Sequence, residues 1–284
     1  MGRIETARGL GELTRPVNAV AAGVLTFIGA FVAGGVADAP LAVTAAVVAT
    51  VFGTGGGNAI NDYFDREIDA INAPDRAIPR GAVEPPEALW FSVACFVVAV
   101  ALAVTLPALA IAIALVNLIA LVTYTKFFKG LPGAGNVLVA YLGGSTFLFG
   151  AAAVGTIGPA VVLFLLAALS TISREIVKDV EDIDGDREEG LRTLPIAIGE
   201  RRALWVAAGC LGVAILASPV PYVLEYFDEV YLAIVLPAAA YMCYAAARAF
   251  DDPTAGQHHL KYGMFLAALS FIVGRAALDL SLPF

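Results

Sequence analysis

Long apolar segments alternate with polar connections along almost the whole chain. A helix needs about 20 apolar residues to cross the hydrocarbon core of a bilayer. The pattern therefore predicts an all-α, polytopic membrane protein, one domain over residues 1–284, with nine transmembrane helices around a central cavity. We expect these helices near residues 16–36, 41–61, 87–105, 107–125, 133–154, 158–179, 203–219, 230–250 and 260–281.

Composition supports the same class. Hydrophobic residues make up 60% of the 284 residues, charged residues only 15%, and the mean hydropathy is +0.83. A typical soluble domain has about 25% charged residues. The three cysteines, Cys95, Cys210 and Cys243, lie inside apolar runs without metal-binding spacing, so we expect neither a disulfide framework nor a thiolate metal site. The net charge of −8 and the lack of a basic stripe argue against nucleic acid as a partner.

The basic residues predict the orientation of the helices. With nine spans and the N-terminus inside, every Lys and Arg except Arg275 falls on the cytoplasmic side. This agrees with the excess of Lys and Arg that cytoplasmic loops carry. Two acidic stretches, at residues 55–81 and 173–195, lie on this side, at the ends of the second and sixth spans. Because those two helices run in the same direction, the stretches can face each other across one cavity.

The first acidic stretch reads GGGNAINDYFDREIDAINAPDRAIPRG. On a helix, Asn58, Asp62, Asp65 and Asp69 fall within an arc of about 60°. One helical face thus carries three carboxylates and an amide. Soluble surfaces often carry such runs for solvation alone, but ionisable groups at a membrane helix usually mark a site or a pathway.

The second stretch, SREIVKDVEDIDGDREEGLRTLP, repeats the pattern of the first. Asp179, Asp182 and Asp186 have the same spacing as the first three aspartates, and Glu175 stands in the place of Asn58, each displaced by 117 positions. Two matching carboxylate faces predict a bound hard cation. Mg²⁺ takes oxygen ligands and commonly bridges carboxylates to substrate phosphates, and it stabilises a departing diphosphate.

The motifs NDYFD with Asp69, and DVEDIDGD, resemble the two aspartate-rich motifs of the UbiA superfamily of intramembrane prenyltransferases. The resemblance covers essentially the whole chain and implies nine transmembrane helices, with the motifs ending helices 2 and 6. Together with YTKFFKG and GNVLVAYLGG, the two stretches resemble most closely the archaeal digeranylgeranylglyceryl phosphate synthases. That family transfers a geranylgeranyl group from geranylgeranyl diphosphate to the glycerol hydroxyl of geranylgeranylglyceryl phosphate in ether-lipid synthesis.

The resemblance also implies roles for individual residues. The six aspartates are implied ligands of Mg²⁺ and diphosphate: Asp62, Asp65, Asp69, Asp179, Asp182 and Asp186. The implied substrate-binding residues are the amides and bases nearby: Arg15, Asn58, Asn61, Arg76, Arg80, Lys126, Lys129 and Arg192. The two lysines can equally be orientation anchors that extend toward the interface, and Arg76, Arg80 and Arg192 can equally be solvated loop residues.

Two alternatives remain open from the residues alone. A sister prenyltransferase that acts on an aromatic quinone precursor or a porphyrin would share both aspartate motifs. A secondary transporter can also combine repeated halves with intramembrane acids. Its sites lie near the bilayer midplane, however, whereas the acids here lie at one membrane face. No residue stands out as the base for the hydroxyl proton, which a released diphosphate oxygen or one of the aspartates could accept.

Overall fold

The computed structural model describes residues 3–128 and 130–281, and this part of the chain contains helices and no strands. A helix lies at each of the nine positions where a span is expected. These helices are α2 (Pro16–Val32), α3 (Pro40–Asn72), α4 (Pro85–Ala103), α5 (Ala108–Thr123), α6 (Ala134–Ala153), α7 (Gly158–Glu181), α10 (Glu200–Ala217), α12 (Glu229–Arg248) and α13 (Pro253–Ser281). Shorter elements join them, namely α1 (Arg3–Leu13), a π-helical turn (Tyr124–Phe128), α8 (Ile183–Glu188), α9 (Leu194–Ile198) and α11 (Val220–Val223).

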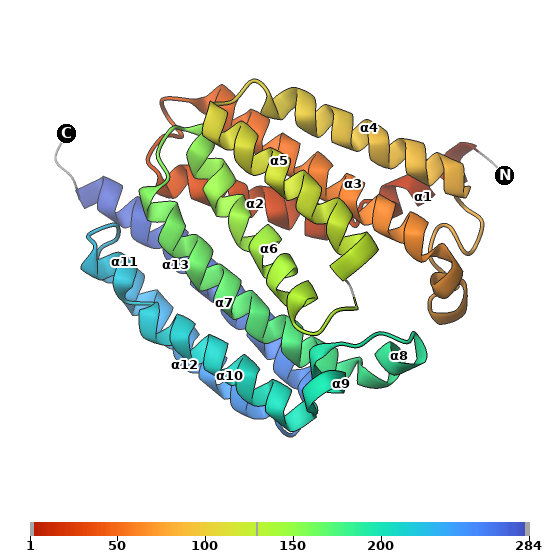
Figure 1. Ribbon diagram of the computed structural model, residues 1–284. Coiled ribbons are helices and arrows are strands. Elements are labelled where there is room, and N and C mark those ends of the chain that lie inside the picture. Colours follow the sequence, from red (N-terminus) through yellow and green to blue (C-terminus); the bar gives the residue numbers. More distant parts are fainter. Residues whose placement is uncertain (1–2, 129, 282–284) are drawn as a thin grey trace.

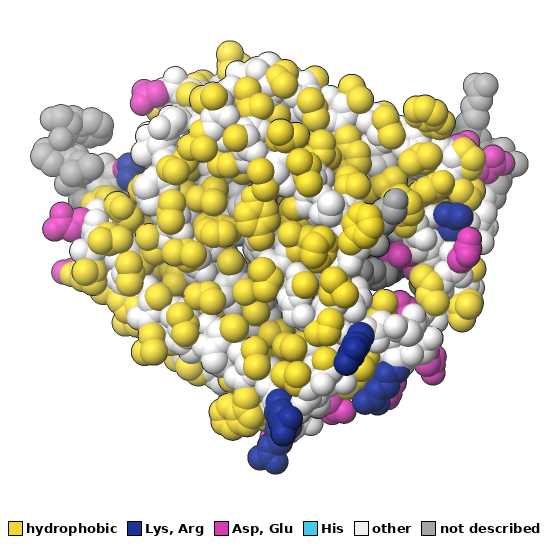
Figure 2. Space-filling model, viewed as in Figure 1, with side chains coloured by type: hydrophobic (Ala, Val, Ile, Leu, Met, Phe, Trp, Pro, Cys, Tyr) yellow, Lys and Arg dark blue, Asp and Glu magenta, His cyan; other side chains and the backbone are white. Residues whose placement is uncertain are grey.

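Not all nine helices are long enough to cross a membrane alone. Within the described residues, seven helical segments are long and apolar enough, with α10 and α11 counted together. α1 and α2 add an eighth if this pair, bent by 46°, is one broken span, whereas α5 is apolar but has only 16 residues. Hydrophobic side chains cover the middle of the bundle, and charged side chains gather toward its margins (Figure 2). The chain is therefore a multi-pass membrane protein, and its described part contains seven or eight helices of sufficient length.

The centre of the bundle is formed where α2 and α6 cross at very short range. A Cβ atom added to Gly29 of α2 would lie 2.1 Å from the carbonyl oxygen of Phe147, and one added to Gly150 of α6 would lie 1.8 Å from that of Thr26. Only glycine allows the two backbones to approach so closely. Buried Phe147, Tyr231 and Phe271 then join this pair to α12 and α13 in one apolar core.

The longer connections gather at one end of the bundle. The loop after α3, the π-helical turn, α8 and α9 lie toward the right of Figure 1, the end at which α1 also lies. α1 packs on the loop after α3 through buried Leu13, Ile78 and Val83. The short connections that precede α3, α5 and α7 lie at the opposite end. Both aspartate-rich stretches are thus at the same end of the molecule.

Candidate active site

The first stretch lies on a single helix, as its spacing predicts. α3 continues to Asn72, about three turns beyond the apolar segment that suggested it, and it carries Asp62, Asp65 and Asp69. Asp62 and Asp69 are each only 6% exposed. Two carboxylates this deeply buried need charged or polar partners.

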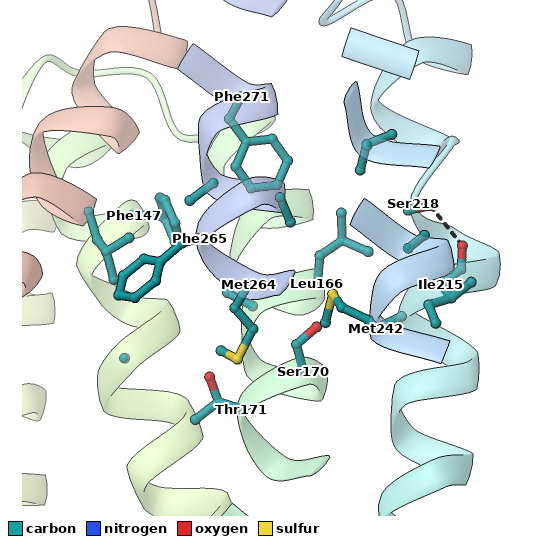
Figure 3. A pocket seen from close by; sticks show the side chains of 18 residues that line it. Phe147, Leu166, Ser170, Thr171, Ile215, Ser218, Met242, Met264, Phe265 and Phe271 are labelled. Carbon is teal, nitrogen blue, oxygen red and sulfur yellow. Dashed lines mark hydrogen bonds between the residues drawn. The ribbon is translucent and has the colours of Figure 1, made fainter. Parts of the chain in front are cut away.

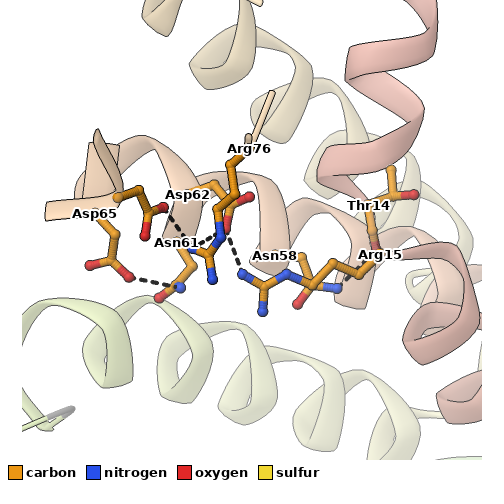
Figure 4. A network of polar contacts seen from close by, with 8 residues as sticks. Thr14, Arg15, Asn58, Asn61, Asp62, Asp65 and Arg76 are labelled. Atoms are coloured by element: carbon orange, nitrogen blue, oxygen red, sulfur yellow. Dashed lines mark hydrogen bonds and ion pairs between the residues drawn. The ribbon is translucent and has the colours of Figure 1, made fainter. Parts of the chain in front are cut away.

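Two arginines supply those partners (Figure 4). Nη2 of Arg15 lies 2.6 Å from Oδ1 of Asp62, and Nη1 of Arg76 lies 2.6 Å from Oδ2 of Asp69 and 3.6 Å from Oδ1 of Asp62. Burial alone would lower the pKa of Arg76, but the carboxylates of Asp69 and Asp62 outweigh it and raise that pKa above its ordinary value. The structure therefore brings together two of the four predicted arginines and two of the six predicted aspartates.

The backbone around Arg15 holds an unusual conformation. Arg15 has φ +46°, in the left-handed region that residues with a side chain rarely adopt, and Pro16 starts α2 directly after it. Nδ2 of Asn58 donates to the carbonyl oxygen of Thr14 at 2.8 Å. Asn58 thus fixes the bend between α1 and α2 that points Arg15 at Asp62. Strained residues of this kind cluster at functional sites.

In the side-chain amide of Asn61, the nitrogen makes a hydrogen bond and the oxygen makes none to the described residues. Its Nδ2 donates to Oδ2 of Asp65 at 3.0 Å. Its Oδ1 is buried and has no hydrogen-bond partner among the residues that the structure describes. A buried amide oxygen without a donor is an unusual cost in a folded protein. It is well suited to accept from water on a hydrated cation.

The second stretch is divided between two helices, whereas the first lies on one continuous helix. α7 ends at Glu181 and α8 begins at Ile183, so Asp182 lies at the junction. Asp179 accepts a hydrogen bond at 2.8 Å from Nδ2 of Asn136, and Asp182 accepts one at 2.5 Å from Nζ of Lys178. Asp186 follows on α8, where burial and the nearby Asp182 raise its pKa.

A hydrogen bond joins the two stretches directly. Nδ2 of Asn72, at the end of α3, donates to Oε1 of Glu189 at 2.8 Å. Sequence analysis did not single out either residue. The signal was nevertheless present, because the two are separated by the same 117 positions that separate Asp62 from Asp179. This direct contact supports the expectation that the two stretches face each other.

Other predicted substrate-binding residues lie elsewhere. Arg80 bonds Glu12 at 2.5 Å and the carbonyl oxygen of Asp75 at 2.6 Å, so it ties α1 to the loop rather than contacting the aspartates. The side chain of Arg192 is exposed, and its backbone N–H donates to Gly130 at 3.1 Å. Lys129 and the side chain of Lys126 lie outside the described residues.

Two pockets lie deeper along α6 and α7. A large apolar pocket is lined by α2, α6, α7, α10, α12 and α13, and Phe147, Leu166, Met242 and Phe271 are part of its wall (Figure 3). A small, mainly polar pocket lies beside the second stretch. Its lining comprises Tyr124, Leu131, Gly135, Asn136, Val139, Glu175, Asp179 and Thr193. The site thus combines carboxylates, a polar pocket and an apolar chamber.

The types of residue present fit a magnesium ion, although the carboxylates that the structure describes are not gathered around a single point. Within the described part of the chain, no three acidic, histidine or cysteine side chains are grouped as metal ligands. The arginine contacts of Asp62 and Asp69 and the hydrogen bond from Asn136 to Asp179 each engage one oxygen of the carboxylate. Carboxylates together with the unpartnered Oδ1 of Asn61 are the hard oxygen donors that Mg²⁺ prefers.

Comparison with known proteins agrees with this arrangement. The chain is 65% identical over 275 residues to the digeranylgeranylglyceryl phosphate synthase of Natronomonas pharaonis, covering 96% of this chain and 99% of that protein. A solved structure from work on digeranylgeranylglyceryl phosphate synthase in membranes is 36% identical, with a TM-score of 0.84 and coverage of 95% and 99%. A UbiA homologue from Archaeoglobus fulgidus, solved bound to GPP and Mg²⁺, shares the fold at 18% identity and a TM-score of 0.75, again covering 95% and 99%.

The family comparison covers most of the membrane-embedded chain. The UbiA prenyltransferase family model matches residues 22–269, a range that contains both aspartate-rich stretches and all helices from α3 to α12. The chain therefore belongs to the UbiA prenyltransferase family.

Proposed function

We propose that this chain transfers a geranylgeranyl group from geranylgeranyl diphosphate to the free glycerol hydroxyl of geranylgeranylglyceryl phosphate. The product, digeranylgeranylglyceryl phosphate, is the core of archaeal ether lipids. The observation that carries this proposal is the 65% identity to a synthase of that name over nearly the full length of both chains. The paired aspartate stretches and the apolar chamber supply the parts that a lipid prenyl transfer requires.

The six aspartates are the proposed holders of Mg²⁺. In this assignment Asp62, Asp65 and Asp69 bind the cation from α3, and Asp179, Asp182 and Asp186 bind it from α7 and α8. When bound, Mg²⁺ supplies the charge that stabilises the departing diphosphate. The Archaeoglobus fulgidus homologue was solved with GPP and Mg²⁺, which is a statement about that protein and gives a precedent in the same fold.

The arginines next to the carboxylates have a second proposed role. Arg15 and Arg76 neutralise Asp62 and Asp69 in the structure described here. Once a cation takes the carboxylates, the guanidinium groups are positioned to bind diphosphate oxygens, for which their forked geometry is suited. Asn58 and Asn61 orient this end of α3, and Lys126, Lys129, Arg80 and Arg192 are proposed to contribute positive charge around the two phosphate groups.

The proposed membrane arrangement follows from charge and length. In this proposal the chain is one domain of nine transmembrane helices, and the end that carries both stretches faces the cytoplasm. The described residues supply seven or eight helices that are long and apolar enough, and α5, with 16 residues, would be a shorter span. The prenyl chains occupy apolar space such as the pocket beside Phe147 and Phe271. A chamber that excludes water protects an allylic cation from hydrolysis.

A product assay tests the proposed function. Purified protein in lipid vesicles is given geranylgeranyl diphosphate and Mg²⁺ with one of three acceptors: geranylgeranylglyceryl phosphate, a hydroxybenzoate or a porphyrin alcohol. Mass spectrometry should find digeranylgeranylglyceryl phosphate with the first acceptor and no prenylated product with the others. Turnover of an aromatic acceptor without turnover of the glycerophosphate lipid would contradict the proposal.

A further inference from the structure

The polar pocket lies immediately next to the apolar pocket, toward the aspartates. On α7, Thr171 lines the apolar pocket and Glu175 the polar one. On α6, Gly143 lines the apolar pocket and Val139, four residues earlier, lines the polar one. Four residues of helix correspond to about 6 Å. A molecule with an apolar tail and a small polar head group can therefore occupy both pockets at once.

We propose that the polar pocket holds the glycerol hydroxyl of the acceptor lipid and that Glu175 accepts its proton. This inference rests on the proposed function and adds the catalytic base, which the motifs do not identify. An acceptor with one isoprenoid chain and a phosphorylated glycerol has the shape that the two adjoining pockets fit. Its chain lies in the apolar pocket, and its hydroxyl reaches the level of Asp179.

The contacts of Glu175 hold its carboxylate at the wall of this pocket. Nη1 of Arg174 donates to Oε1 of Glu175 at 2.7 Å, and Nη2 of Arg174 donates to Oε1 of Gln257 on α13 at 3.0 Å. Glu175 is partly buried, with 20% of its side chain exposed. The arginine is thereby fixed between α7 and α13, and it fixes the carboxylate in turn. A base that must meet one hydroxyl needs this kind of restraint.

Asp179 lies one helical turn from Glu175 and is held separately. Residues four positions apart project from the same face of a helix, and Asn136 donates to Asp179 at 2.8 Å from the opposite wall. A proposed ligand of the cation and the proposed base therefore lie side by side. The hydroxyl beside Glu175 is in consequence close to where the diphosphate of the donor is held.

Thr193 adds a buried hydroxyl to the pocket. It is 6% exposed, and it lies close enough to Asp186 to lower the pKa of that carboxyl against the larger effect of burial, although its Oγ1 makes no hydrogen bond of normal geometry to any described residue. A ligand oxygen in the pocket can therefore bond this hydroxyl. An oxygen of the glycerol or of its phosphate is suited to this position.

In the proposed step one carbon–oxygen bond breaks and another forms. The bond between C1 of the geranylgeranyl group and the diphosphate oxygen breaks, and its electron pair leaves with diphosphate. The glycerol oxygen forms the new bond to C1, and its proton passes to the carboxylate of Glu175. Water takes that proton when the product leaves. General base catalysis of this kind contributes about 10²–10⁴-fold in rate.

The test compares transfer with hydrolysis of the donor. Glu175→Gln should lower the rate of digeranylgeranylglyceryl phosphate formation by about 100-fold or more. Without acceptor, the slow Mg²⁺-dependent hydrolysis of geranylgeranyl diphosphate to geranylgeraniol should stay within about threefold of the wild-type rate, because ionisation of the donor does not need the base. Glu188→Gln, at an exposed position of α8, is the matched control and should retain transfer.

Three results would overturn the inference. One is transfer by Glu175→Gln within a few-fold of wild type. Another is an equal loss of transfer and hydrolysis, which would place Glu175 at the donor instead. If that variant does not fold, Thr193→Val is the second probe, and it should raise the Michaelis constant for the acceptor several-fold and leave that for the donor unchanged. If Thr193→Val changes neither Michaelis constant, the polar pocket is not part of the acceptor site. Failure of the wild-type protein to use the glycerophosphate lipid would instead contradict the proposed function.

Discussion

Asn72 and Glu189 occupy corresponding positions in the two acidic stretches, and they contact each other at 2.8 Å. Each lies ten residues beyond the first aspartate of its own stretch, Asp62 or Asp179. The repeat in the sequence is therefore also a contact in space. This bond joins the end of α3 to the end of α8.

The contact between Asn72 and Glu189 should couple the two metal-binding halves. Asn72→Ala and Glu189→Ala should each cost less than about 1.5 kcal/mol in stability, because the bond is exposed. Each should raise the Mg²⁺ concentration for half-maximal activity several-fold, and the double variant should be no worse than either single one. A double-mutant cycle measures this coupling. Additive effects would mean that the two stretches bind the cation independently.

Arg15 should stabilise the protein chiefly while the cation is absent. Arg15→Ala leaves Asp62, which is 6% exposed, with Arg76 at 3.6 Å as its remaining cationic contact in the described structure. Loss of a hydrogen bond between charged groups costs about 1.5–3 kcal/mol. We expect a lower melting temperature in detergent with a chelator present, and a smaller deficit with Mg²⁺ and diphosphate, since the cation then compensates Asp62.

Arg8→Ala is the control for this measurement. Arg8 is on the same N-terminal helix, but its side chain is 81% exposed and pairs only with Glu12 at 3.2 Å among the residues described. An exposed pair of this kind contributes little. A deficit for Arg15→Ala that is equal with and without Mg²⁺ would show that the arginine has a purely structural role.

The local features of this site could be predicted from the sequence, and the tertiary ones could not. The helical spacing of Asp62, Asp65 and Asp69 placed them on one helix, and α3 carries all three. Arg275 and Asp279, four positions apart on α13, likewise form an ion pair, at 2.9 Å. Both results depend only on the geometry of a single helix.

Contacts between distant segments needed the folded chain. Asn136 lies in a run of small and apolar residues, and its partner Asp179 is 43 positions away, so no periodicity pointed to it. Arg80 differs from expectation because Glu12, on α1, competes for its guanidinium. The length of α5 also could not be fixed, since its apolar run continues into the π-helical turn.

Loss of a carboxylate should lower turnover much more at the repeated aspartates than at a neighbouring aspartate outside the repeat. Asp62→Asn and Asp179→Asn should each lower turnover by orders of magnitude, and chelation should abolish wild-type turnover, because Mg²⁺ needs anionic oxygen ligands. Asp184→Asn is the control, since Asp184 lies in the same DVEDIDGD motif but outside the repeated spacing, with its side chain 91% exposed. Radiolabelled donor gives the rates. Similar losses in all three variants would contradict the assignment by spacing.

Asp186 should make the metal-free protein sensitive to pH. Its pKa is raised in the folded state by burial and by Asp182, so the folded protein holds this proton more tightly than the unfolded chain does. The contribution of Asp186 to stability is therefore present below the ordinary aspartate pKa and is lost as pH rises through the raised value. Asp186→Asn should accordingly melt at a higher temperature than wild type at pH 7 in chelator. It should also gain less stability from added Mg²⁺.

Lys126 should serve the acceptor phosphate more than the donor. Its backbone belongs to the π-helical turn, which packs against both α3 and α6 and whose Tyr124 lines the polar pocket. The turn thus lies between the proposed diphosphate site and the proposed acceptor site, where two polyanions would repel each other strongly in a water-poor cavity. A cation at this position offsets that repulsion.

Lys126→Ala should therefore raise the Michaelis constant for geranylgeranylglyceryl phosphate more than that for geranylgeranyl diphosphate. Steady-state kinetics with each substrate varied in turn measures both constants, and Lys261→Ala, at an exposed position of α13, serves as the control. Because the acceptor binds through one phosphate and the donor also through the aspartate-bound cation, loss of one lysine weakens the acceptor more. Equal increases for both substrates would assign the lysine to the donor.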